Sequence, residues 1–282
     1  MKLSIKSLIL GLGILLSFNS YSWNAVGHMV VANIAYQNLQ PAVRTKVDAM
    51  VADLNKEYPY ITHFSQLGPW PDALRSQRIE SFTHWHYVDL AISGDGTPIK
   101  NIADTDNAIW AINKIEPVLK NVKANPYEHA RFLAFLVHIV ADIHQPLHTV
   151  ARITAAYPSG DKGGNLYIIK YPAQNPHVMP LHKLWDEGFE LFNNDTSTTH
   201  IDALTNQITA QYPIQYFGSK VTELTAADWA KEGVELAPAL VYSTPENEVP
   251  SPMYITLGKQ TAEQRAALAG YRLANLLNLL LA

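Results

Sequence analysis

Hydrophobic residues recur along this 282-residue chain with the spacing of amphipathic helices. Over residues 25–39 and 104–122, apolar side chains return every three or four positions, which places them on one face of a helix. Residues 126–144 are apolar almost all round, a pattern typical of a buried central helix. The same criteria predict further helices over residues 41–54, 181–192, 198–211, 225–242 and 261–281.

Residues that start or stop helices mark the ends of some of these segments. Asp104 is a candidate N-cap for the helix over residues 104–122, because aspartate accepts hydrogen bonds from the free N–H groups of a first turn. Pro146 ends the central helix. Thr261 and Gln264 form a capping-box pattern, which predicts that the C-terminal helix begins at Thr261.

Strand signals are sparse by comparison. Residues 166–171 (LYIIKY) follow the turn-like sequence GDKGG and predict a small β-hairpin. Residues 93–101 and 243–252 are rich in turn residues, which indicates loops. No internal repeat or flexible linker divides the chain. We therefore expect an all-α fold: one mainly helical domain with a small β-hairpin.

The first 22 residues have the pattern of a cleaved signal peptide. Two lysines precede an apolar run over residues 8–18, and the sequence Ser-Tyr-Ser ends at Ser22. The run is too short to span a bilayer, which takes about 20 residues. Cleavage after Ser22 would leave Trp23 as the first residue. We therefore expect a signal peptide over 1–22, a domain over 23–282, and a secreted or periplasmic protein.

The leucine-rich C-terminal helix could suggest a membrane anchor. Arg272, Asn275 and Asn278 interrupt its apolar sequence, however. Charged and amide side chains at this density are expensive inside a bilayer. We therefore expect a helix that packs on the domain, and no stable association with a membrane.

Composition narrows the possible classes of protein. Hydrophobic residues make up 48% of the chain, which excludes a disordered protein. The absence of cysteine excludes disulfides, thiolate zinc sites and a thiol nucleophile. Removal of the two lysines in residues 1–22 would change the formal net charge from −4 to −6, which excludes a broad basic surface for duplex nucleic acid. The 11 histidines are a high number for this length, and they point to the chemistry.

The strongest chemical signal is the sequence HIVADIHQPLH at the end of the predicted central helix. His138 and Asp142 are four residues apart, so both project from one face of that helix. An imidazole and a carboxylate at this spacing can bind one metal ion or bridge two. His144 and His148 follow closely. Burying so many polar groups without partners is costly, so a metal site is favoured over a hydrogen-bonded polar core.

Other candidates are weaker when each is taken alone. His182 and Asp186 repeat the same spacing, yet a hydrogen-bonded pair on a helix surface gives the same pattern. An aspartate after proline, such as Asp72, usually caps a helix or a turn. In the sequence THWHYVD, an extended chain would place His84 and His86 on one face, and either could be a ligand.

Together these segments resemble the trinuclear-zinc nucleases, the secreted single-strand nucleases of the nuclease S1 and nuclease P1 type. The resemblance rests on Trp23 with His28, on WPDALR over residues 70–75, on HYVD over 86–89, on the two His/Asp motifs and on GGN over 163–165. His28 taken alone would more often be a core or surface histidine. The wider superfamily includes zinc phospholipase C. The resemblance implies a single-domain fold of the phospholipase C/P1 nuclease kind.

Carried over to this sequence, the resemblance implies three zinc ions. The implied ligands of the first ion are Asp72, His86, His138 and Asp142. Those of the second are His148, His182 and Asp186. Those of the third are the α-amino nitrogen and carbonyl oxygen of Trp23, with His28 and a bridging Asp142. The resemblance thus selects His86 over His84, and it leaves His144 to support the ligands from outside.

The same resemblance implies roles in catalysis. Asp72 would orient or deprotonate the attacking water, and Arg75 would pair with a phosphate oxygen. Tyr87 would offer an aromatic surface for a base. The implied enzyme is a metal-dependent hydrolase, an endonuclease that cuts single-stranded DNA and RNA to 5′-phosphate products and also acts on 3′-nucleotides. We expect a monomer.

Two other functions stay open at this point. A zinc-dependent phospholipase C would use similar ligands, although phospholipases usually carry glutamate where Asp186 stands. A zinc-binding protein without enzymatic activity is the other alternative. The chain also departs from the fungal and plant nucleases in having no cysteine. Zinc ions that join the N-terminus to the central helix would then replace disulfides as cross-links.

Overall fold

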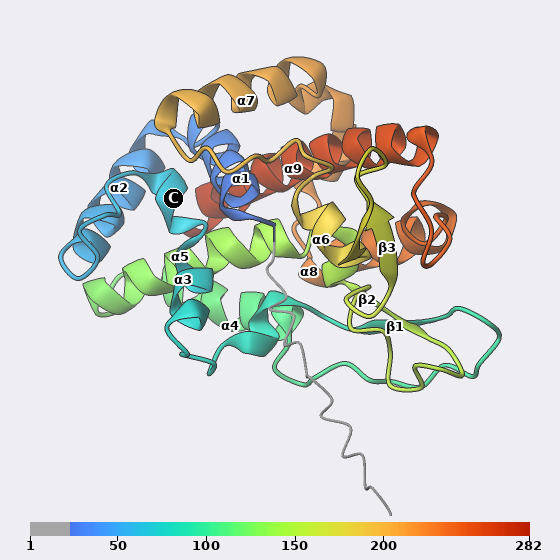
Figure 1. Ribbon diagram of the computed structural model, residues 1–282. Coiled ribbons are helices and arrows are strands. Elements are labelled where there is room, and N and C mark those ends of the chain that lie inside the picture. The colour runs from blue at the N-terminus through green and yellow to red at the C-terminus, as the bar shows by residue number, and fades with distance from the viewer. Residues whose placement is uncertain (1–22) are drawn as a thin grey trace, which may run out of the picture.

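The computed structural model describes residues 23–282, so the predicted signal peptide lies outside the described residues. Within them the protein is mainly helical, with two small sheets (Figure 1), which confirms the predicted fold class. The α-helices are α1 (Ala25–Gln37), α2 (Pro41–Asn55), α3 (Trp70–Ser76), α4 (Ala108–Lys120), α5 (Pro126–Asp142), α6 (Leu181–Asp186), α7 (Thr198–Gln211), α8 (Ala226–Leu236) and α9 (Pro252–Leu280). Shorter helical turns are η1 (Phe64–Leu67), η2 (Thr83–His86), η3 (Pro146–His148), η4 (Ile214–Thr222) and η5 (Ala237–Val241).

Helix α5 lies at the centre of the domain, as its apolar sequence predicts. Helices α2 and α4 pack along it, and α1 packs against both α5 and the long helix α9. Figure 1 shows α5 between α2 and the small sheets, with α7 and α9 above it. All side chains from Leu133 to Asp142 are buried. The polar residues at the end of α5 are therefore enclosed by the core.

The C-terminal helix begins well before the predicted position. The Ser251 hydroxyl accepts a hydrogen bond from the N–H of Tyr254, and Pro252 occupies the first turn, so α9 starts there. The Thr261 hydroxyl donates to the carbonyl of Leu257 at 2.8 Å, as in a helix interior. The predicted start at Thr261 is wrong because a complete cap lies upstream.

Three other helices differ from their predicted ranges. Helix α4 begins at Ala108 because the side chain of Asn107, rather than that of Asp104, caps its first turn. The segment predicted over 225–242 is α8 followed by the π-helical turn η5. Helix α6 ends at Asp186 because three residues of positive φ follow it, which no α-helix can contain: Gly188, Phe189 and Glu190.

The two sheets have two strands each. Strand β3 (Ile168–Tyr171) pairs antiparallel with β4 (His177–Pro180), which confirms the predicted hairpin. Strand β1 (Leu90–Ser93) pairs in parallel with β2 (Val150–Ile153), a pair that the sequence analysis missed. Four residues are too short a run for the alternation of a half-buried strand to stand out.

The parallel pair brings two histidine segments together. Strand β1 follows closely on His86, and β2 follows on His148. The N–H of Val88 donates to the carbonyl of His148 at 2.8 Å, which continues the pairing towards both histidines. The missed sheet therefore helps to position two of the predicted ligands.

Helix α9 is docked on the domain, as predicted. Most of its side chains after Ala262 are buried, including that of Arg272. The end of the chain lies beside α2 (Figure 1), where Lys46 Nζ donates to the carbonyl of Leu281 at 2.6 Å. Among residues 23–282, no helix is both long enough and apolar enough to cross a membrane.

Candidate metal centre

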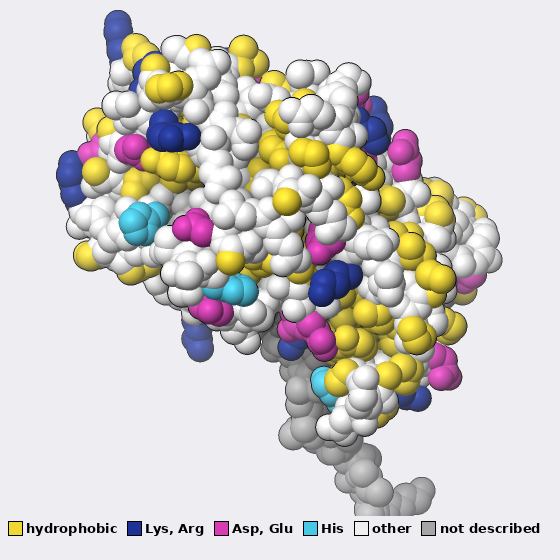
Figure 2. Space-filling view, turned by 90° about the horizontal axis from the view of Figure 1, so that it is seen from above, with side chains coloured by type: hydrophobic (Ala, Val, Ile, Leu, Met, Phe, Trp, Pro, Cys, Tyr) yellow, Lys and Arg dark blue, Asp and Glu magenta, His cyan; other side chains and the backbone are white. Residues whose placement is uncertain are grey.

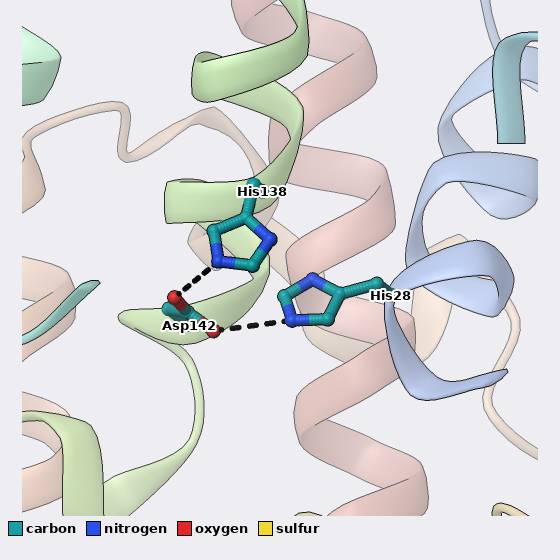
Figure 3. Close-up of side chains that lie close together, drawn as sticks. All are labelled: His28, His138 and Asp142. Carbon is teal, nitrogen blue, oxygen red and sulfur yellow. Dashed lines mark ion pairs between the residues drawn. The ribbon is translucent and has the colours of Figure 1, made fainter. Parts of the chain in front are cut away.

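The end of α5 carries two polar side chains that face α1. His138 Nε2 lies 2.9 Å from Asp142 Oδ2, one turn along the helix. His28 of α1 approaches the other carboxylate oxygen, with its Nε2 3.3 Å from Asp142 Oδ1 (Figure 3). The rings of His28 and His138 stack with their centroids 4.0 Å apart. These three buried side chains form the His28 group.

Asp72 and His86 extend this cluster on the side of α3 and η2. His86 Nδ1 lies 3.2 Å from Asp142 Oδ2 and 3.7 Å from Asp72 Oδ1. Together with His138 these two residues form the His86 group, whose nitrogen and oxygen atoms lie within 4.8 Å of one another. His138 belongs to both groups, so the two sites adjoin.

The turn η2 decides between the two histidines that the sequence left open. Residues Thr83–His86 form a 3₁₀ turn rather than an extended segment, so His84 and His86 do not share a face. His84 is partly exposed, with its Nδ1 2.9 Å from Asp106 Oδ1, whereas His86 is buried. The extended alternative is therefore wrong, and His86 joins the cluster while His84 does not.

A third group lies next to the first two. His182 and Asp186 share one face of α6, with His182 Nε2 3.2 Å from Asp186 Oδ2. His148 of η3 completes this His148 group, with its Nε2 3.5 Å from Asp186 Oδ1. His148 Nδ1 is also 3.9 Å from Asp142 Oδ1, so Asp142 lies among all three groups.

Backbone carbonyls hold three of these imidazole rings in place. A carbonyl oxygen only accepts hydrogen bonds, so each Nδ1 that faces one carries a hydrogen. In the neutral ring, Nε2 is then the nitrogen whose lone pair can bind a metal. Metal-binding histidines are commonly oriented in this way. The pairs are His138 with Gly68 (2.7 Å), His148 with His86 (2.7 Å) and His182 with Gly163 (2.6 Å).

Sequence reasoning missed the residues that orient these ligands. Gln145 Nε2 donates to Asp186 Oδ1 at 2.7 Å. Gly163 has a φ of +58°, and a Cβ there would lie 2.2 Å from the carbonyl oxygen of Leu147, so a side chain does not fit. The GGN sequence marks this position, but its partner His182 is apparent only in the fold.

Several buried polar atoms of these groups have no hydrogen-bond partner among residues 23–282. They are both ring nitrogens of His28, Asp142 Oδ1 and His148 Nε2. The 3.3 Å approach of His28 to Asp142 therefore lacks the geometry of a hydrogen bond. Burying these atoms unpaired is costly. Metal ions would satisfy them together, and imidazole nitrogens with carboxylate oxygens suit zinc, so the residues present fit this metal.

The electrostatics of the cluster keep its central carboxylate ionised. Burial raises the pKa of Asp142, but His138 and His148 outweigh this effect and hold the pKa well below its usual range. Burial lowers the pKa of His148, but Asp142 outweighs burial and raises that pKa to about 9. Burial also lowers the pKa values of His28 and His86. Asp142 is thus an anion at neutral pH, which favours a cation beside it.

Trp23, the first described residue, is fixed beside this cluster. Its indole N–H donates to the carbonyl of Ala141 at 2.9 Å, and its ring packs edge-on against Phe192 with centroids 5.1 Å apart. The side chain is fully buried. Because Ala141 immediately precedes Asp142, these contacts anchor the start of the described chain next to the end of α5.

A cleft of about 480 Å³ opens over the His86 and His148 groups. Arg75 lies one turn after Asp72 in α3, and Tyr87 directly follows His86. The Tyr87 hydroxyl donates to Asp104 Oδ2 at 3.4 Å. The cleft therefore presents a cation, an aromatic ring and three metal-type ligands to whatever enters it: Arg75, Tyr87, His86, His148 and His182.

His144 turns away from this centre. Its Nδ1 donates to the carbonyl of Val140 at 2.7 Å, and its Nε2 accepts from Arg272 Nη1 at 3.0 Å. The ring packs against Trp229 of α8 with centroids 5.1 Å apart. The expectation that His144 supports the metal ligands is therefore wrong, because its contacts among residues 23–282 include none of the residues of the three groups.

Comparison with known proteins agrees with this geometry. The family described as S1/P1 Nuclease matches residues 23–282. The chain belongs to the S1/P1 nuclease family. It is similar to Endonuclease 1 of Arabidopsis thaliana (28% identical, covering 64% of this chain), to Nuclease S1 of Aspergillus oryzae (25% identical, 67%) and to Nuclease P1 of Penicillium citrinum (24% identical, 91%).

Membership of the S1/P1 nuclease family confirms the resemblance and the enzyme class that it implies, a nuclease. The matched region spans 58% of the length of Endonuclease 1 and 63% of that of Nuclease S1, against 97% of that of Nuclease P1. These three relatives are nucleases by name, so the comparisons give no support to the phospholipase C alternative.

Proposed function

We propose that this protein is a secreted or periplasmic zinc-dependent endonuclease. It hydrolyses single-stranded DNA and RNA to 5′-phosphate products and also acts on 3′-nucleotides. One observation carries the proposal: three buried His/Asp groups meet at Asp142, beneath a cleft that Arg75 and Tyr87 line. Phosphodiester hydrolysis needs cations that can hold the charge of the phosphoryl group, and this arrangement has the ligands to bind them.

The proposed metal complement is three zinc ions. The three groups of donors support this number, although His138 is common to the His28 and His86 groups and is assigned here to the first ion. The first ion binds Asp72, His86, His138 and Asp142, and the second binds His148, His182 and Asp186. The third binds His28 and Asp142 together with the α-amino nitrogen and carbonyl oxygen of Trp23.

Processing after Ser22 is part of the proposal. An α-amino group can bind zinc only if Trp23 is the true N-terminus, so removal of residues 1–22 completes the third site. The burial of Trp23 beside Ala141 supports this role. Residues 23–282 then form the zinc-dependent nuclease domain, which acts as a monomer.

The catalytic steps fall to residues of the cleft. Zinc bound at these groups would supply a water of lowered pKa and stabilise charge on the phosphoryl oxygens. Asp72 orients the attacking water or accepts its proton. Burial raises the pKa of Asp72, but His138 and His86 outweigh burial and lower it, which keeps the carboxylate in its basic form. Arg75 pairs with a non-bridging oxygen of the scissile phosphate.

Substrate selection follows from the cleft rather than from surface charge. On the face shown in Figure 2, Lys and Arg side chains are scattered among acidic and hydrophobic ones. Such a face offers little to hold a duplex by its phosphates. A flexible strand can instead place one phosphate at the metal centre and stack a base on Tyr87.

Product analysis from a short single-stranded oligonucleotide tests the function. The protein with Trp23 as its first residue should give fragments with 5′-phosphate ends, a chelator should abolish them, and phosphatidylcholine should not be hydrolysed. Asp72→Asn should lose activity, whereas Asp202→Asn, at an exposed position of α7, should keep it. Fragments with 3′-phosphate ends, or cleavage that survives chelation, would contradict the proposal.

A second test addresses the N-terminus. A variant that retains Ser22 before Trp23 should bind one zinc ion fewer per chain and lose at least about 90% of its turnover. Metal analysis and kinetics of this variant decide the point. A full zinc complement with normal turnover would remove Trp23 from the proposed ligand set.

A further inference from the structure

A second cavity, of about 450 Å³, lies between η4, α8 and α9. None of the His/Asp groups of the metal centre lines it. Its walls instead combine aromatic, cationic, amide and acidic side chains. Those that bear on its function are Tyr216, Phe217, Lys220, Gln264 and Arg265, together with the carboxylates of Glu232 and Glu235.

Arg265 is a buried cation with one unpartnered donor. Only 6% of the residue is exposed. Its Nε donates to the carbonyl of His144 at 2.8 Å, and its Nη1 donates to Glu232 Oε2. Its Nη2 has no hydrogen-bond partner in the part of the chain that the structure describes. A buried guanidinium N–H without a partner is costly, so this atom points to a ligand that accepts hydrogen bonds.

Glu232 also pairs with a different arginine. Arg272 Nη1 and Nη2 donate to the two oxygens of Glu232 at 2.8 Å each, the forked geometry of a strong Arg–carboxylate pair. Arg272 is itself fully buried. Arg272 has a second carboxylate nearby, with its Nη2 3.6 Å from Glu223 Oε2, so Glu232 is left as the carboxylate that pairs with Arg265. A phosphate in the cavity would supply the acceptor that Arg265 Nη2 lacks.

The aromatic wall adds a second recognition element. The ring of Tyr216 is 57% exposed, a large fraction for a tyrosine at the mouth of a cavity. It packs edge-on against Phe217 with centroids 5.1 Å apart, and its hydroxyl accepts from Gln264 Nε2 at 3.4 Å. Exposed aromatic faces stack with nucleobases at about 1–3 kcal/mol per base. Lys220, four residues after Tyr216, places an exposed ammonium group on the same wall.

We propose that this cavity is a second nucleotide-binding site, which takes a nucleoside 5′-monophosphate with its base on Tyr216 and its phosphate between Lys220 and Arg265. The nucleotide can be free or can be the 5′-terminal residue of a strand, since both present the same base and phosphate. The site goes beyond the proposed function, because it needs neither zinc nor catalysis.

Calorimetric titration of the zinc-loaded protein with adenosine 5′-monophosphate tests the proposal. Tyr216→Ala with Lys220→Ala removes exposed groups and leaves Arg265 and the metal ligands intact, so the fold should persist. This double variant should bind one nucleotide fewer per chain, or bind it at least about 10-fold more weakly. Its turnover of a 3′-nucleotide should stay unchanged. Because binding and turnover are measured separately, failure here is distinct from failure of the nuclease assignment.

A matched control uses a similar pair of residues elsewhere. Tyr60 is 54% exposed and stands four residues after Lys56, whose side chain is also exposed. Tyr60→Ala with Lys56→Ala should leave nucleotide binding unchanged. Equal stoichiometry and affinity for all three proteins would overturn the proposal, as would equal loss in both double variants.

Three further ligands test the two recognition elements and the source of the nucleotide. Inorganic phosphate and adenosine should each bind at least about 10-fold more weakly than the monophosphate, because phosphate lacks the base and adenosine lacks the phosphate. A 5′-phosphorylated oligonucleotide with uncleavable linkages should compete with the monophosphate if strand ends enter the cavity. Absence of competition restricts the site to free nucleotides. Phosphate binding as tight as that of the nucleotide would overturn the proposed role of Tyr216.

Discussion

Two polar clusters adjoin the end of α5, and they are stabilised in different ways. The metal cluster comprises the three His/Asp groups around Asp142. The arginine cluster consists of His144, Glu232, Arg265 and Arg272. In the arginine cluster nearly every polar atom has a protein partner, whereas several atoms of the metal cluster have none among residues 23–282.

The difference teaches how to recognise a metal site from its surroundings. Among residues 23–282, the ion-pair partners of Asp142 are all imidazoles, and no arginine or lysine side chain pairs with it. Glu232 has two guanidinium groups, and no metal is needed beside it. A buried carboxylate needs hydrogen bonds or a nearby cation. Around Asp142 the protein offers imidazoles, and bound metal ions would also satisfy the ring nitrogens of His28 and His148 that have no partner among residues 23–282.

The largest expected effect comes from the centre of the metal cluster. Asp142→Asn removes the negative charge shared by the groups, so zinc content should fall and turnover of a single-stranded oligonucleotide should drop roughly 1,000-fold, a barrier increase of about 4 kcal/mol. Metal analysis and kinetics measure both. Retention of all zinc with normal turnover would show that the carboxylate is not the shared ligand.

A substitution in the arginine cluster should lower the free energy of unfolding and leave the zinc content unchanged. Arg272→Met leaves the Nε2 of His144 without its donor and Glu232 with one guanidinium fewer, so the free energy of unfolding should fall by about 3–5 kcal/mol. Denaturant unfolding of the chelated proteins measures this loss. Adding Glu232→Leu should not recover this loss, because it leaves the buried guanidinium of Arg265 without its carboxylate. A change below about 1 kcal/mol would mean that the pair contributes little.

Removal of zinc by a chelator should destabilise the metal cluster and leave the arginine cluster unaffected. When free zinc exceeds the dissociation constant 100-fold, each of the three sites adds about 2.7 kcal/mol to the free energy of unfolding. In a domain of this size, each kcal/mol corresponds to about 2–4 °C of melting temperature. A chelator should therefore lower the melting temperature by roughly 15–30 °C. Arg272→Met should show a similar chelator-dependent shift. Superimposable melting curves with and without chelator would contradict a cross-linking role for zinc.

The smallest effect concerns pH. Burial raises the pKa of Glu232, but Arg272 and Arg265 outweigh burial and hold the pKa well below its ordinary value of 4.5. Because the folded pKa lies below the unfolded one, the stability from this group is present above about pH 4.5 and is lost as the pH falls towards the folded pKa. The stability advantage of the chelated wild type over Glu232→Gln should shrink between pH 6 and pH 3. A stability advantage that stays constant over this pH range would contradict the lowered pKa of Glu232.

The metal cluster could be predicted from the sequence further than the arginine cluster could. His138 with Asp142 and His182 with Asp186 follow from helix spacing alone, because residues four apart share a face. His86 could not be separated from His84 by spacing, since the answer depends on the 3₁₀ turn η2. The resemblance supplied that choice, and the fold brings the chosen histidine to Asp142.

The arginine cluster could not be predicted from the sequence. In the sequence, Arg272 only interrupts an apolar helix, and its partner Glu232 lies 40 residues away in α8. His144 sits among metal-type residues in the sequence, yet its Nε2 accepts a hydrogen bond from Arg272. Pairings between helices that are distant in sequence depend on tertiary packing, which local patterns do not encode.

The most direct test of the account is a count of metal ions. Inductively coupled plasma mass spectrometry of the purified protein that begins at Trp23 should give three zinc ions per chain. His28→Ala and His182→Ala should each lower that number by about one, and Arg272→Met should leave it at three. A wild-type protein that binds no zinc, yet is folded and cleaves single strands, would contradict the claim that the unpaired atoms around Asp142 are metal ligands.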